Sequence, residues 1–319
     1  MSKKEEAEYE EYESLKNSKF KQQKLPGWRP VPSMIRTTSI FFALGITFAG
    51  LGVLILLFSN NAVEYIERYD SICLNNKTCN ITFDIKKKIN KNIMIYYQLD
   101  GFYQNHRRYM KSKSEEQFKG NKINLTKAKE DCNPVITNKQ MGFDNEISPY
   151  TNKKMNGSEI AIPCGLMAKN YFNDTFSNWT IIFTDKPNQN IEINDTNIAR
   201  KYDRDNYKNI NDNLVDQWIN MTDEHFLVWM RPAPLPNFTK LYGRIEEDLG
   251  PDIHLFVNIS NNYNVTNFNG SKYIILRTVN NFGGKNTMLA ITYIIFGGIC
   301  IILAIIFIIG YNAKAKKEK

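Results

Sequence analysis

The chain contains 319 residues, of which 42% are hydrophobic and 23% are charged, and its formal net charge is +8. Its 11 Pro and 17 Gly are too few for a collagen-like or a Pro/Gly-rich disordered chain, and 13% aromatic residues are too many for a disordered, solvating chain. Five Cys are too few for a small disulfide-dense scaffold.

The first strong signal along the chain is an apolar segment. Residues 40–58 form a run of 19 residues without a charged side chain, and a helix of this length crosses a hydrocarbon core of about 30 Å. A buried core helix is the alternative, but soluble helices rarely stay apolar around their whole circumference for so long. A cleaved signal peptide is disfavoured because the leader is long and acidic near its start. We therefore predict an uncleaved transmembrane helix at 39–58 that follows a cytosolic arm at 1–38.

The next region, 59–287, is rich in sequons for N-linked glycosylation. Chance gives about three or four Asn-x-Ser/Thr sequences in a region with this content of Asn, Ser and Thr. The candidate glycosylation sites are Asn76, Asn80, Asn124, Asn156, Asn173, Asn178, Asn194, Asn220, Asn237, Asn258, Asn264 and Asn269. This excess over chance predicts that the region is a glycosylated domain in the lumen or outside the cell.

The cysteines of the same region agree with this compartment. Four of the five Cys in the chain lie here: Cys73, Cys79, Cys132 and Cys164. An even number of cysteines in an oxidising compartment predicts two disulfides, and three pairings are possible. We favour Cys73–Cys79 around a short turn, together with Cys132–Cys164. A zinc site is the competing interpretation, but the sequence lacks CxxC spacing and supporting His.

Short strands dominate the secondary structure expected between 59 and 287. Apolar and polar residues alternate in 81–85 and 255–259, and further short β-rich runs lie at 94–99, 179–184 and 273–279. Helical pieces are expected only at 114–129 and 214–220, and three prolines in 232–236 favour an extended surface or edge segment. Many short strands without a βαβ rhythm predict a mainly antiparallel, sandwich-like β domain with short helical insertions.

The sequence contains no recognisable catalytic motif. It lacks GxSxG, HExxH and EF-hand sequences, and Gly-Lys-Asn at 284–286 departs from a P-loop at the first Gly and at the Ser/Thr position. The His-Arg-Arg sequence at 106–108 could bind a phosphate or act as an acid/base group, and the acidic residues at 246–248 could hold a cation. Surface packing and a solvated acidic turn are the better interpretations of these two segments. We therefore expect neither enzymatic activity nor a bound metal or cofactor.

A second apolar segment, 288–311, again has the length of a membrane span, and a basic tail follows at 312–319. Eight Lys/Arg precede the first span and four follow the second. The positive-inside rule therefore predicts that both ends are cytosolic and that 59–287 lies on the opposite side. The net charge divides into +2 for 1–38 (8 basic, 6 acidic), +3 for 39–311 (29 and 26) and +3 for the tail (4 and 1). Because no part forms a basic domain, we expect no nucleic-acid partner.

Five groups of short strings, in order along the chain, resemble one known family. They are QQKLPGWRP at 22–30, FYQNHRRY at 102–109, PCGL at 163–166 with FND at 172–174, WMR at 229–231 with KLYGRI at 240–245, and GGKN at 283–286. Together they resemble the CDC50/LEM3 family, the β subunits of P4-type ATPase phospholipid flippases. The resemblance covers most of the chain, and both apolar segments have their expected places.

The resemblance implies a non-catalytic subunit whose partners are a P4-type ATPase and membrane phospholipids. ATP hydrolysis would belong to the ATPase, and this chain would support its exit from the endoplasmic reticulum, its stability and its translocation cycle. The complex would reside in the endoplasmic reticulum, the Golgi or endosomes, or the plasma membrane. Two helices alone cannot enclose a lipid pathway, which also favours a subunit. The alternatives are a cell-surface receptor or adhesion glycoprotein, and a membrane-tethered ecto-enzyme.

The resemblance also suggests where the chain contacts the ATPase. The candidate interface residues are Leu25, Pro26, Trp28 and Pro30 in the cytosolic arm, Gly45, Ala49, Gly297 and Gly298 in the spans, and Phe102, Tyr103, His106, Arg107, Arg108, Trp229, Arg231, Tyr242 and Arg244 in the outer domain. Small residues in the spans would let helices pack closely, either on the ATPase or on each other. Trp28 could instead be a plain membrane anchor. The outer segments 102–109 and 229–245 could form a contact surface or part of the core.

Overall fold

The computed structural model describes residues 9, 12–25, 27, 33–73, 77–89, 93–183, 187–210, 217–279 and 283–317. The chain divides into two compact units. The helical unit contains the chain up to Leu54 together with Met288–Lys319, and the β domain is Ile55–Thr287.

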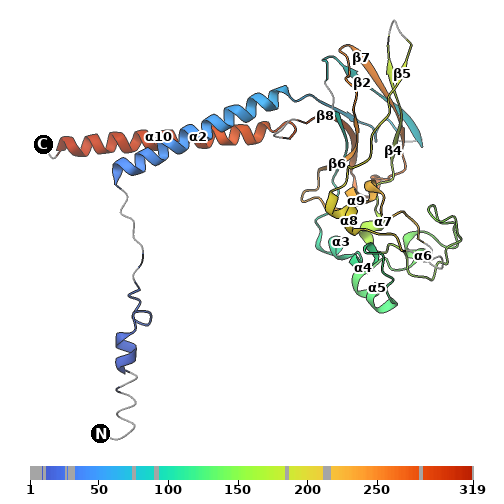
Figure 1. Ribbon diagram of the computed structural model, residues 1–319, viewed down its shortest axis with the longest axis horizontal. Helices are drawn as coiled ribbons and strands as arrows, with labels where there is room; N and C mark the ends of the chain where they lie inside the picture. The colour runs from blue at the N-terminus through green and yellow to red at the C-terminus, as the bar shows by residue number, and fades with distance from the viewer. Residues whose placement is uncertain are drawn as a thin grey trace. The chain divides into compact units, whose positions relative to one another are not determined.

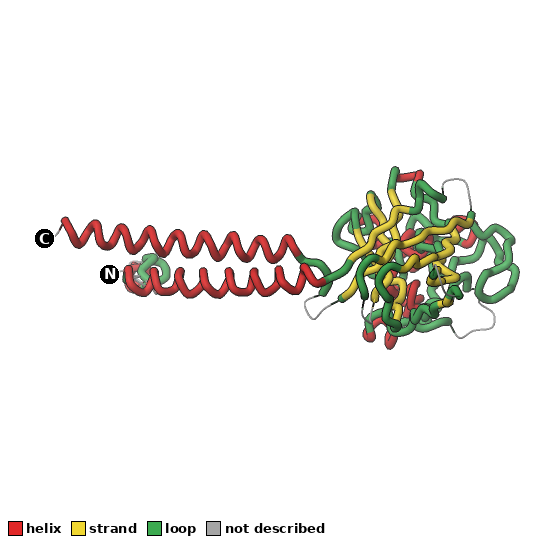
Figure 2. The backbone as a smooth tube through the Cα atoms, turned by 90° about the horizontal axis from the view of Figure 1, so that it is seen from above, coloured by secondary structure: helices red, strands yellow, loops and turns green. Residues whose placement is uncertain are grey.

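Two long helices, α2 (Met34–Asn61) and α10 (Thr287–Lys317), are long and apolar enough to cross a membrane. Most of their side chains are exposed in the structure, and the two helices run side by side (Figure 2). Their contact is close because it is made by small residues. A Cβ atom added to Gly45 would lie 2.6 Å from Cγ1 of Ile301, and one added to Gly297 would lie 2.6 Å from the backbone nitrogen of Ala49. Glycine at both positions therefore permits this helix–helix approach.

The β domain contains two four-stranded sheets (Figure 1). The first has the order β1 (Glu64–Arg68), β8 (Ser271–Thr278), β3 (Ile93–Asp100), β6 (Phe238–Ile245), and the second has the order β2 (Thr78–Ile85), β7 (Ile253–Ser260), β4 (Thr175–Ile182), β5 (Gln189–Asn190). All pairs of neighbouring strands are antiparallel. The expectation of a mainly antiparallel, sandwich-like domain is therefore confirmed.

The alternation of side chains along the strands explains the two layers. In β3, every second residue from Ile93 to Leu99 is buried, and in β7 every second residue from Ile253 to Ile259 is buried. These side chains belong to one continuous hydrophobic core, together with Phe83 of β2. The predicted strands at 81–85, 94–99, 255–259 and 273–279 fall within β2, β3, β7 and β8, except for residue 279. The run 179–184 corresponds to the second half of β4, and residue 184 lies outside the described residues.

Short helices gather at one end of the two sheets, which we call the helical end (Figure 1). They are α3 (Arg107–Lys111), α4 (Glu115–Phe118), α5 (Leu125–Cys132), α6 (Asn138–Met141), α7 (Leu166–Lys169), α8 (Lys201–Asn206) and α9 (Glu224–Met230). A 3-10 helix, η1 (Thr266–Phe268), precedes β8. The rest of the helical end is irregular loop, so most of its elements have no more than two turns.

The two helices expected from the sequence were placed only in part correctly. The single helix at 114–129 is wrong: α4 and α5 replace it, because the chain turns at Gly120 with a φ of +86°. Of the helix expected at 214–220, residues 214–216 lie outside the described residues and 217–220 are not helical. The helix of this region is α9, which begins where the Asp223 carboxylate accepts a hydrogen bond from the backbone N–H of His225 at 2.7 Å.

A buried ion pair ties the two sheets together. Nζ of Lys272, in β8, lies 2.6 Å from Oδ2 of Asp174, which directly precedes β4, and the two side chains are 1% and 0% exposed. Asp174 also accepts hydrogen bonds from the Tyr69 hydroxyl at 2.8 Å and from the backbone N–H groups of Asn262 and Tyr263 at 2.6 Å. Burial lowers the pKa of Lys272, and the charge of Asp174 opposes that shift. Full hydrogen bonding of the carboxylate is what makes this buried pair tolerable.

Candidate partner interface

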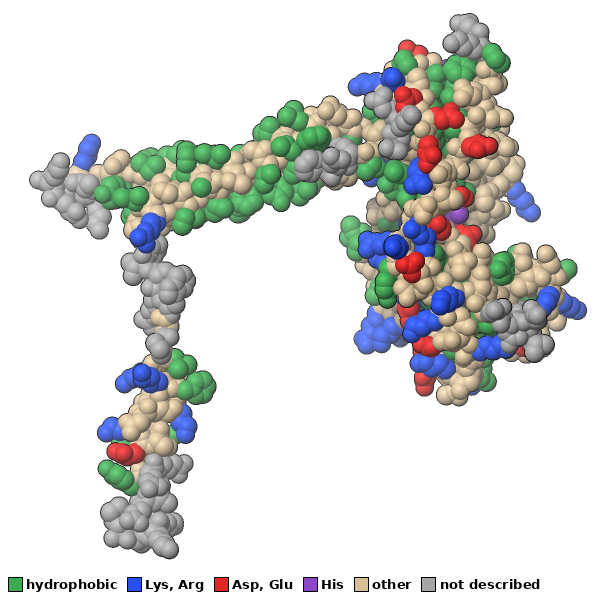
Figure 3. Space-filling view, in the orientation of Figure 1, with side chains coloured by type: hydrophobic (Ala, Val, Ile, Leu, Met, Phe, Trp, Pro, Cys, Tyr) green, Lys and Arg blue, Asp and Glu red, His purple; other side chains and the backbone are tan. Residues whose placement is uncertain are grey.

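The segment that contains α3 carries a group of exposed basic side chains. His106, Arg107, Arg108 and Lys111 are all exposed, and none of them forms an ion pair with a residue that the structure describes. Neighbouring lysines are neutralised instead: Lys113 by Glu115 at 2.5 Å, Lys119 by Glu116 at 2.9 Å and Lys127 by Asp131 at 3.0 Å. Figure 3 shows Lys and Arg side chains over this end of the β domain. The local carboxylates are thus used elsewhere, and the α3 cations remain uncompensated.

A second segment, the proline-rich loop 232–236, lies against the segment that leads into α3. The side-chain amide of Asn105 donates a hydrogen bond to the carbonyl of Pro234 at 2.8 Å, and the buried Gln104 accepts one from the backbone N–H of Ala233 at 2.9 Å. Tyr103 and Leu235 are 61% and 64% exposed. They belong to two segments that these hydrogen bonds hold together. The sequence alone does not reveal that these two segments are in contact, because they are about 130 residues apart along the chain.

A cavity of about 910 Å³ opens beside α3. Its lining is Phe102, Tyr103, His106, Arg108, Tyr109, Lys111, Asn133, Pro134, Leu166 and Asn170. Apolar and aromatic side chains form most of its walls, and all of its charged groups are basic. We call this cavity, with the cations of α3 and the loop 232–236, the cationic surface. Exposed aromatic and Arg side chains around an apolar hollow are typical of protein–protein contact sites.

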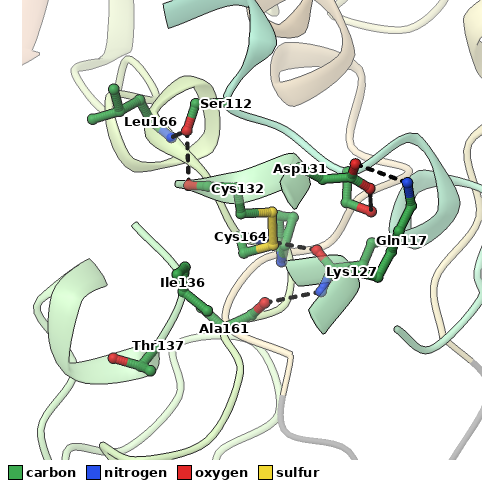
Figure 4. Close-up of a disulfide and its surroundings, with 12 residues drawn as sticks. Ser112, Gln117, Lys127, Asp131, Cys132, Ile136, Thr137, Ala161, Cys164 and Leu166 are labelled. Carbon is green, nitrogen blue, oxygen red and sulfur yellow. Dashed lines mark hydrogen bonds and ion pairs between the residues drawn. A yellow bond between two sulfur atoms is a disulfide. The ribbon is translucent and has the colours of Figure 1, made fainter. Parts of the chain in front are cut away.

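The disulfide Cys132–Cys164, shown in Figure 4, lies next to Asn133 and two residues from Leu166, which both line that cavity. The Ser112 hydroxyl, directly after α3, donates to the carbonyl of Cys132 at 2.9 Å and accepts from the backbone N–H of Leu166 at 2.8 Å. The Gln117 side chain donates to Ala161 and accepts from the backbone N–H of Cys164 at 2.9 Å. The cross-link and the two polar side chains thus hold α3, α5 and α7 in one arrangement.

The aromatic residues behind the cationic surface belong to the core. Trp229 is fully buried, and its indole N–H donates to the carbonyl of Met167 at 2.8 Å. The half-buried ring of Phe102 lies 5.8 Å from that of Trp229 and 5.5 Å from that of Tyr109. Of the two roles expected for 102–109 and 229–245, Trp229 takes the core role, whereas Tyr103, His106 and the two arginines are exposed.

The other candidate residues of the outer segments lie apart from the cavity. Arg231 pairs with Asp203 at 2.9 Å, and Arg244 pairs with Glu246 at 3.0 Å. Tyr242 is half-buried, and its hydroxyl accepts the backbone N–H of Phe176 at 3.1 Å. These side chains have local partners, unlike the cations of α3.

Lys240 was not identified from the sequence, yet it holds the position of α9. Its ammonium donates to the carbonyls of Val228 at 2.8 Å and Trp229 at 3.0 Å, and also to that of Arg231. These carbonyls end α9, where a helix has no backbone donors left for them. Burial, with a smaller contribution from Arg231, lowers the pKa of Lys240 to about 7. A Lys at an inward strand position, following a helix and a proline-rich loop, is the signal that could have predicted this role.

The candidates in the helical unit fall into three groups. Gly45, Ala49 and Gly297 contact one another between α2 and α10, whereas a Cβ on Gly298 would meet no atom within 4 Å. Leu25 is exposed. Pro26, Trp28 and Pro30 lie outside the described residues.

The cysteines and sequons of the β domain have these positions. The disulfides are Cys73–Cys79 and Cys132–Cys164, the pairing that the sequence favours. Asn76 lies outside the described residues; Asn194, Asn220 and Asn258 are half-buried, and the other eight sequon asparagines are exposed. Within the described part of the chain, no three His, Cys, Asp or Glu side chains converge as metal ligands would.

Comparison with known proteins agrees with this architecture. The model of the LEM3 (ligand-effect modulator 3)/CDC50 family matches residues 3–317. The chain belongs to the CDC50/LEM3 family. It is 37% identical to putative ALA-interacting subunit 2 of Arabidopsis thaliana over 292 residues, which cover 82% of this chain and 77% of the relative. It is 31% identical to cell cycle control protein 50A of Mus musculus over 308 residues, which cover 82% and 79%. With its two apolar helices, this CDC50/LEM3 protein is a membrane protein.

Several residues of the cationic surface could not be found from the sequence of this CDC50/LEM3 protein. Lys111, Asn133, Pro134, Leu166 and Asn170 line the cavity without belonging to the predicted set. Asn133 and Leu166 lie within two residues of the disulfide cysteines. The favoured Cys132–Cys164 pairing already brings these two residues near each other, although it does not show that they line a cavity.

Proposed function

We propose that this protein is the non-catalytic accessory subunit of a P4-type ATPase phospholipid flippase. It supports the exit of the ATPase from the endoplasmic reticulum, its stability and its translocation of membrane phospholipids. The family match over nearly the whole chain supports this role, as do the plant relatives, whose names describe ALA-interacting subunits. ATP hydrolysis belongs to the ATPase in this proposal, and this chain contributes no catalytic group.

The observation that carries the proposal is the cationic surface. Three exposed cations, Arg107, Arg108 and Lys111, have no ion pair with a described residue and stand beside an apolar cavity, so they are available to an acidic partner surface. A P4-type ATPase that presents acidic residues on its short outer loops would supply both the charge and the apolar contact. The exposed Tyr103 and Leu235 side chains would be covered in the same complex.

The topology belongs to the same proposal. The arm at 1–38 and the tail at 312–319 lie in the cytosol, 39–58 and 288–311 span the membrane, and 59–287 is outside. The complex resides in the endoplasmic reticulum, the Golgi or endosomes, or the plasma membrane. The distribution of Lys and Arg and the twelve sequons support this orientation. Glycosidase treatment that leaves the mobility of the chain unchanged, in a cell that glycosylates, would contradict it.

The test of the proposed function is affinity purification of the full chain in mild detergent, followed by mass spectrometry. We expect a P4-type ATPase to co-purify in near-stoichiometric amount. Deletion of this chain should retain that ATPase in the endoplasmic reticulum, and re-expression should release it. The proposal fails if no P4-type ATPase co-purifies and if the distribution of these ATPases is the same with and without the chain.

A further inference from the structure

A second, smaller pocket of about 260 Å³ lies in the β domain, and none of the residues that line it lines the cavity beside α3. Its lining is Tyr97, Tyr171, Phe172, Asn173, Asp174, Thr175, His225 and Tyr242. Tyr97 and Phe172 are buried and stack with their ring centroids 3.9 Å apart, whereas Tyr171, His225 and Tyr242 are half-buried. The pocket is therefore walled by aromatic rings that are partly open to solvent.

The polar groups of the pocket are of two kinds. The Asp174 carboxylate is already occupied by Lys272, Tyr69 and two backbone N–H groups, so it offers no charge to a ligand. The Tyr171 hydroxyl, by contrast, forms no hydrogen bond with any described residue. Nε2 of His225 lies 3.4 Å from the exposed carboxylate of Asp195. The free donors and acceptors suit a neutral ligand with several hydroxyl or amide groups.

Asn173, at the edge of this pocket, is the first residue of the sequon Asn173-Asp174-Thr175. Its side chain is exposed and makes no hydrogen bond to a described residue, while its backbone carbonyl accepts from Asn262 at 3.1 Å. In two other sequon asparagines, the side-chain nitrogen Nδ2, to which a sugar would be attached, already donates a hydrogen bond. Nδ2 of Asn194 donates to Glu246 at 2.8 Å, and Nδ2 of Asn258 donates to Asn80 at 2.7 Å.

We propose that Asn173 carries an N-linked glycan and that its first N-acetylglucosamine occupies the aromatic pocket. The volume has room for one sugar ring and is below that of pockets for drug-sized ligands. The C–H face of a pyranose packs on aromatic rings, and its hydroxyl and N-acetyl groups meet Tyr171 and His225. Because the sugar is bonded to Asn173, which itself lines the pocket, no free ligand has to be captured.

The covalent step is the ordinary one for this modification. Nδ2 of Asn173 attacks the anomeric carbon C1 of a lipid-linked oligosaccharide pyrophosphate. The C1–O bond to the pyrophosphate breaks, the lipid pyrophosphate leaves with the electron pair, and Nδ2 gives up one proton. No oxidant or metal redox change is involved. The inference rests on the proposed function only for the exposure of the β domain to the glycosylating compartment.

The first test measures protection of the sugar in the folded protein. The full chain, purified in detergent from a glycosylating cell, is treated with peptide N-glycosidase F, and release at each sequon is followed by site-resolved mass spectrometry. We expect release at Asn173 to be slower than at the exposed Asn124 by about tenfold or more, because the linkage is reached only after local opening. After denaturation the two rates should become equal. Equal rates in the folded protein, or an unmodified Asn173 beside other modified sequons, would overturn the inference.

The second test measures stability with matched variants. Thr175→Ala removes the sequon of Asn173, Thr175→Ser keeps it, and Thr126→Ala removes the sequon of Asn124, which lines neither of the two pockets described above. We expect Thr175→Ala to lower Tm by about 2–4 °C and the other two variants to leave it unchanged. An equal Tm for Thr175→Ala and Thr175→Ser contradicts the inference. Absence of sugar at all sequons would contradict the proposed topology as well, so the two failures can be told apart.

Discussion

The two sheets and the helical end of the β domain are stabilised in different ways. The sheets are stabilised by strand pairing and by a core of alternating apolar side chains, such as Ile95 and Leu255, to which many residues contribute. Helices of four to eight residues cannot be stable by themselves. The helical end depends instead on a small number of specific groups: the Cys132–Cys164 disulfide, Ser112, Gln117 and Lys240.

This difference shows which contacts determine the shape of the candidate interface. The cationic surface lies on the helical end, whose short helices are not stable by themselves. The disulfide and the hydrogen bonds of Ser112, Gln117 and Lys240 hold these helices in position. The sheets provide the base on which those contacts are anchored. Loss of one contact should therefore reshape the interface before it unfolds the sheets.

The largest effect should come from the fully buried charged pair of Lys272 and Asp174. Asp174→Ala leaves Lys272 buried without its counter-ion, and breaking such a pair costs about 3–5 kcal/mol. Thermal unfolding of the purified full chain measures this loss. Glu116→Ala, which breaks the exposed pair with Lys119, is the control and should lower Tm far less, because an exposed pair is screened by water. If both variants unfold alike, the core does not depend on this pair.

Removal of the long disulfide should rank next and should act on the helical end. Replacing Cys132 and Cys164 by Ser opens a loop with a sequence separation of 32, which the chain-entropy model values at about 3–4 kcal/mol. The corresponding change at Cys73 and Cys79, with a separation of 6, should cost about 2 kcal/mol. Hydrogen exchange should locate the first change in α3, α5 and α7. If hydrogen exchange in the variant without Cys132–Cys164 became faster across β3 and β7 instead, the sheets would depend on this disulfide as much as the helical end does.

A smaller effect is expected at the C-terminal end of α9. Lys240→Met leaves three carbonyls without their donor and should cost about 1–3 kcal/mol. Its pH dependence has a definite sign. The folded pKa is about 7 and the ordinary value is 10.5, so between these values only the unfolded chain keeps the proton. The free energy of unfolding contributed by Lys240 therefore rises with pH in that window, by at most about 1.4 kcal/mol per unit.

Unfolding of wild type and Lys240→Met at pH 7, 8 and 9 isolates this contribution. The difference in Tm between the two proteins should grow as the pH rises. A constant or shrinking difference would show that Lys240 stays charged in the folded protein throughout.

The strands were predictable where burial alternates without interruption. β3 and β7 each bury every second residue, which a single sequence reveals directly. β6 was missed because its inward positions include Lys240 beside Phe238, a charge where the pattern demands an apolar residue. β1 was missed because it is a short edge strand that buries none of its side chains fully. What defines β1 as a strand is its pairing with β8, which lies more than 200 residues later in the chain.

The candidate interface was predictable only in its local part. The cations of FYQNHRRY stand together in the sequence, and their exposure could not be distinguished there from burial in a core. The loop 232–236 reaches them through Asn105 and Gln104, contacts that no local pattern encodes. The uncompensated charge itself depends on where Glu115, Glu116 and Asp131 find their partners.

The central claim is that the cationic surface binds a P4-type ATPase, and it requires a variant that changes charge without changing the fold. Arg107→Glu with Arg108→Glu reverses two exposed side chains and should alter the stability of the β domain by under about 0.5 kcal/mol. Lys129→Glu with Lys154→Glu makes the same change of charge on two exposed residues that do not line the cavity.

The most direct measurement is the ratio of ATPase to this chain after affinity purification in mild detergent. We expect the Arg107/Arg108 variant to lower that ratio by about tenfold or more, and the Lys129/Lys154 variant to leave it at the wild-type value. Equal ratios for wild type and both variants, with all three folded, would contradict the assignment of the cationic surface as the partner interface.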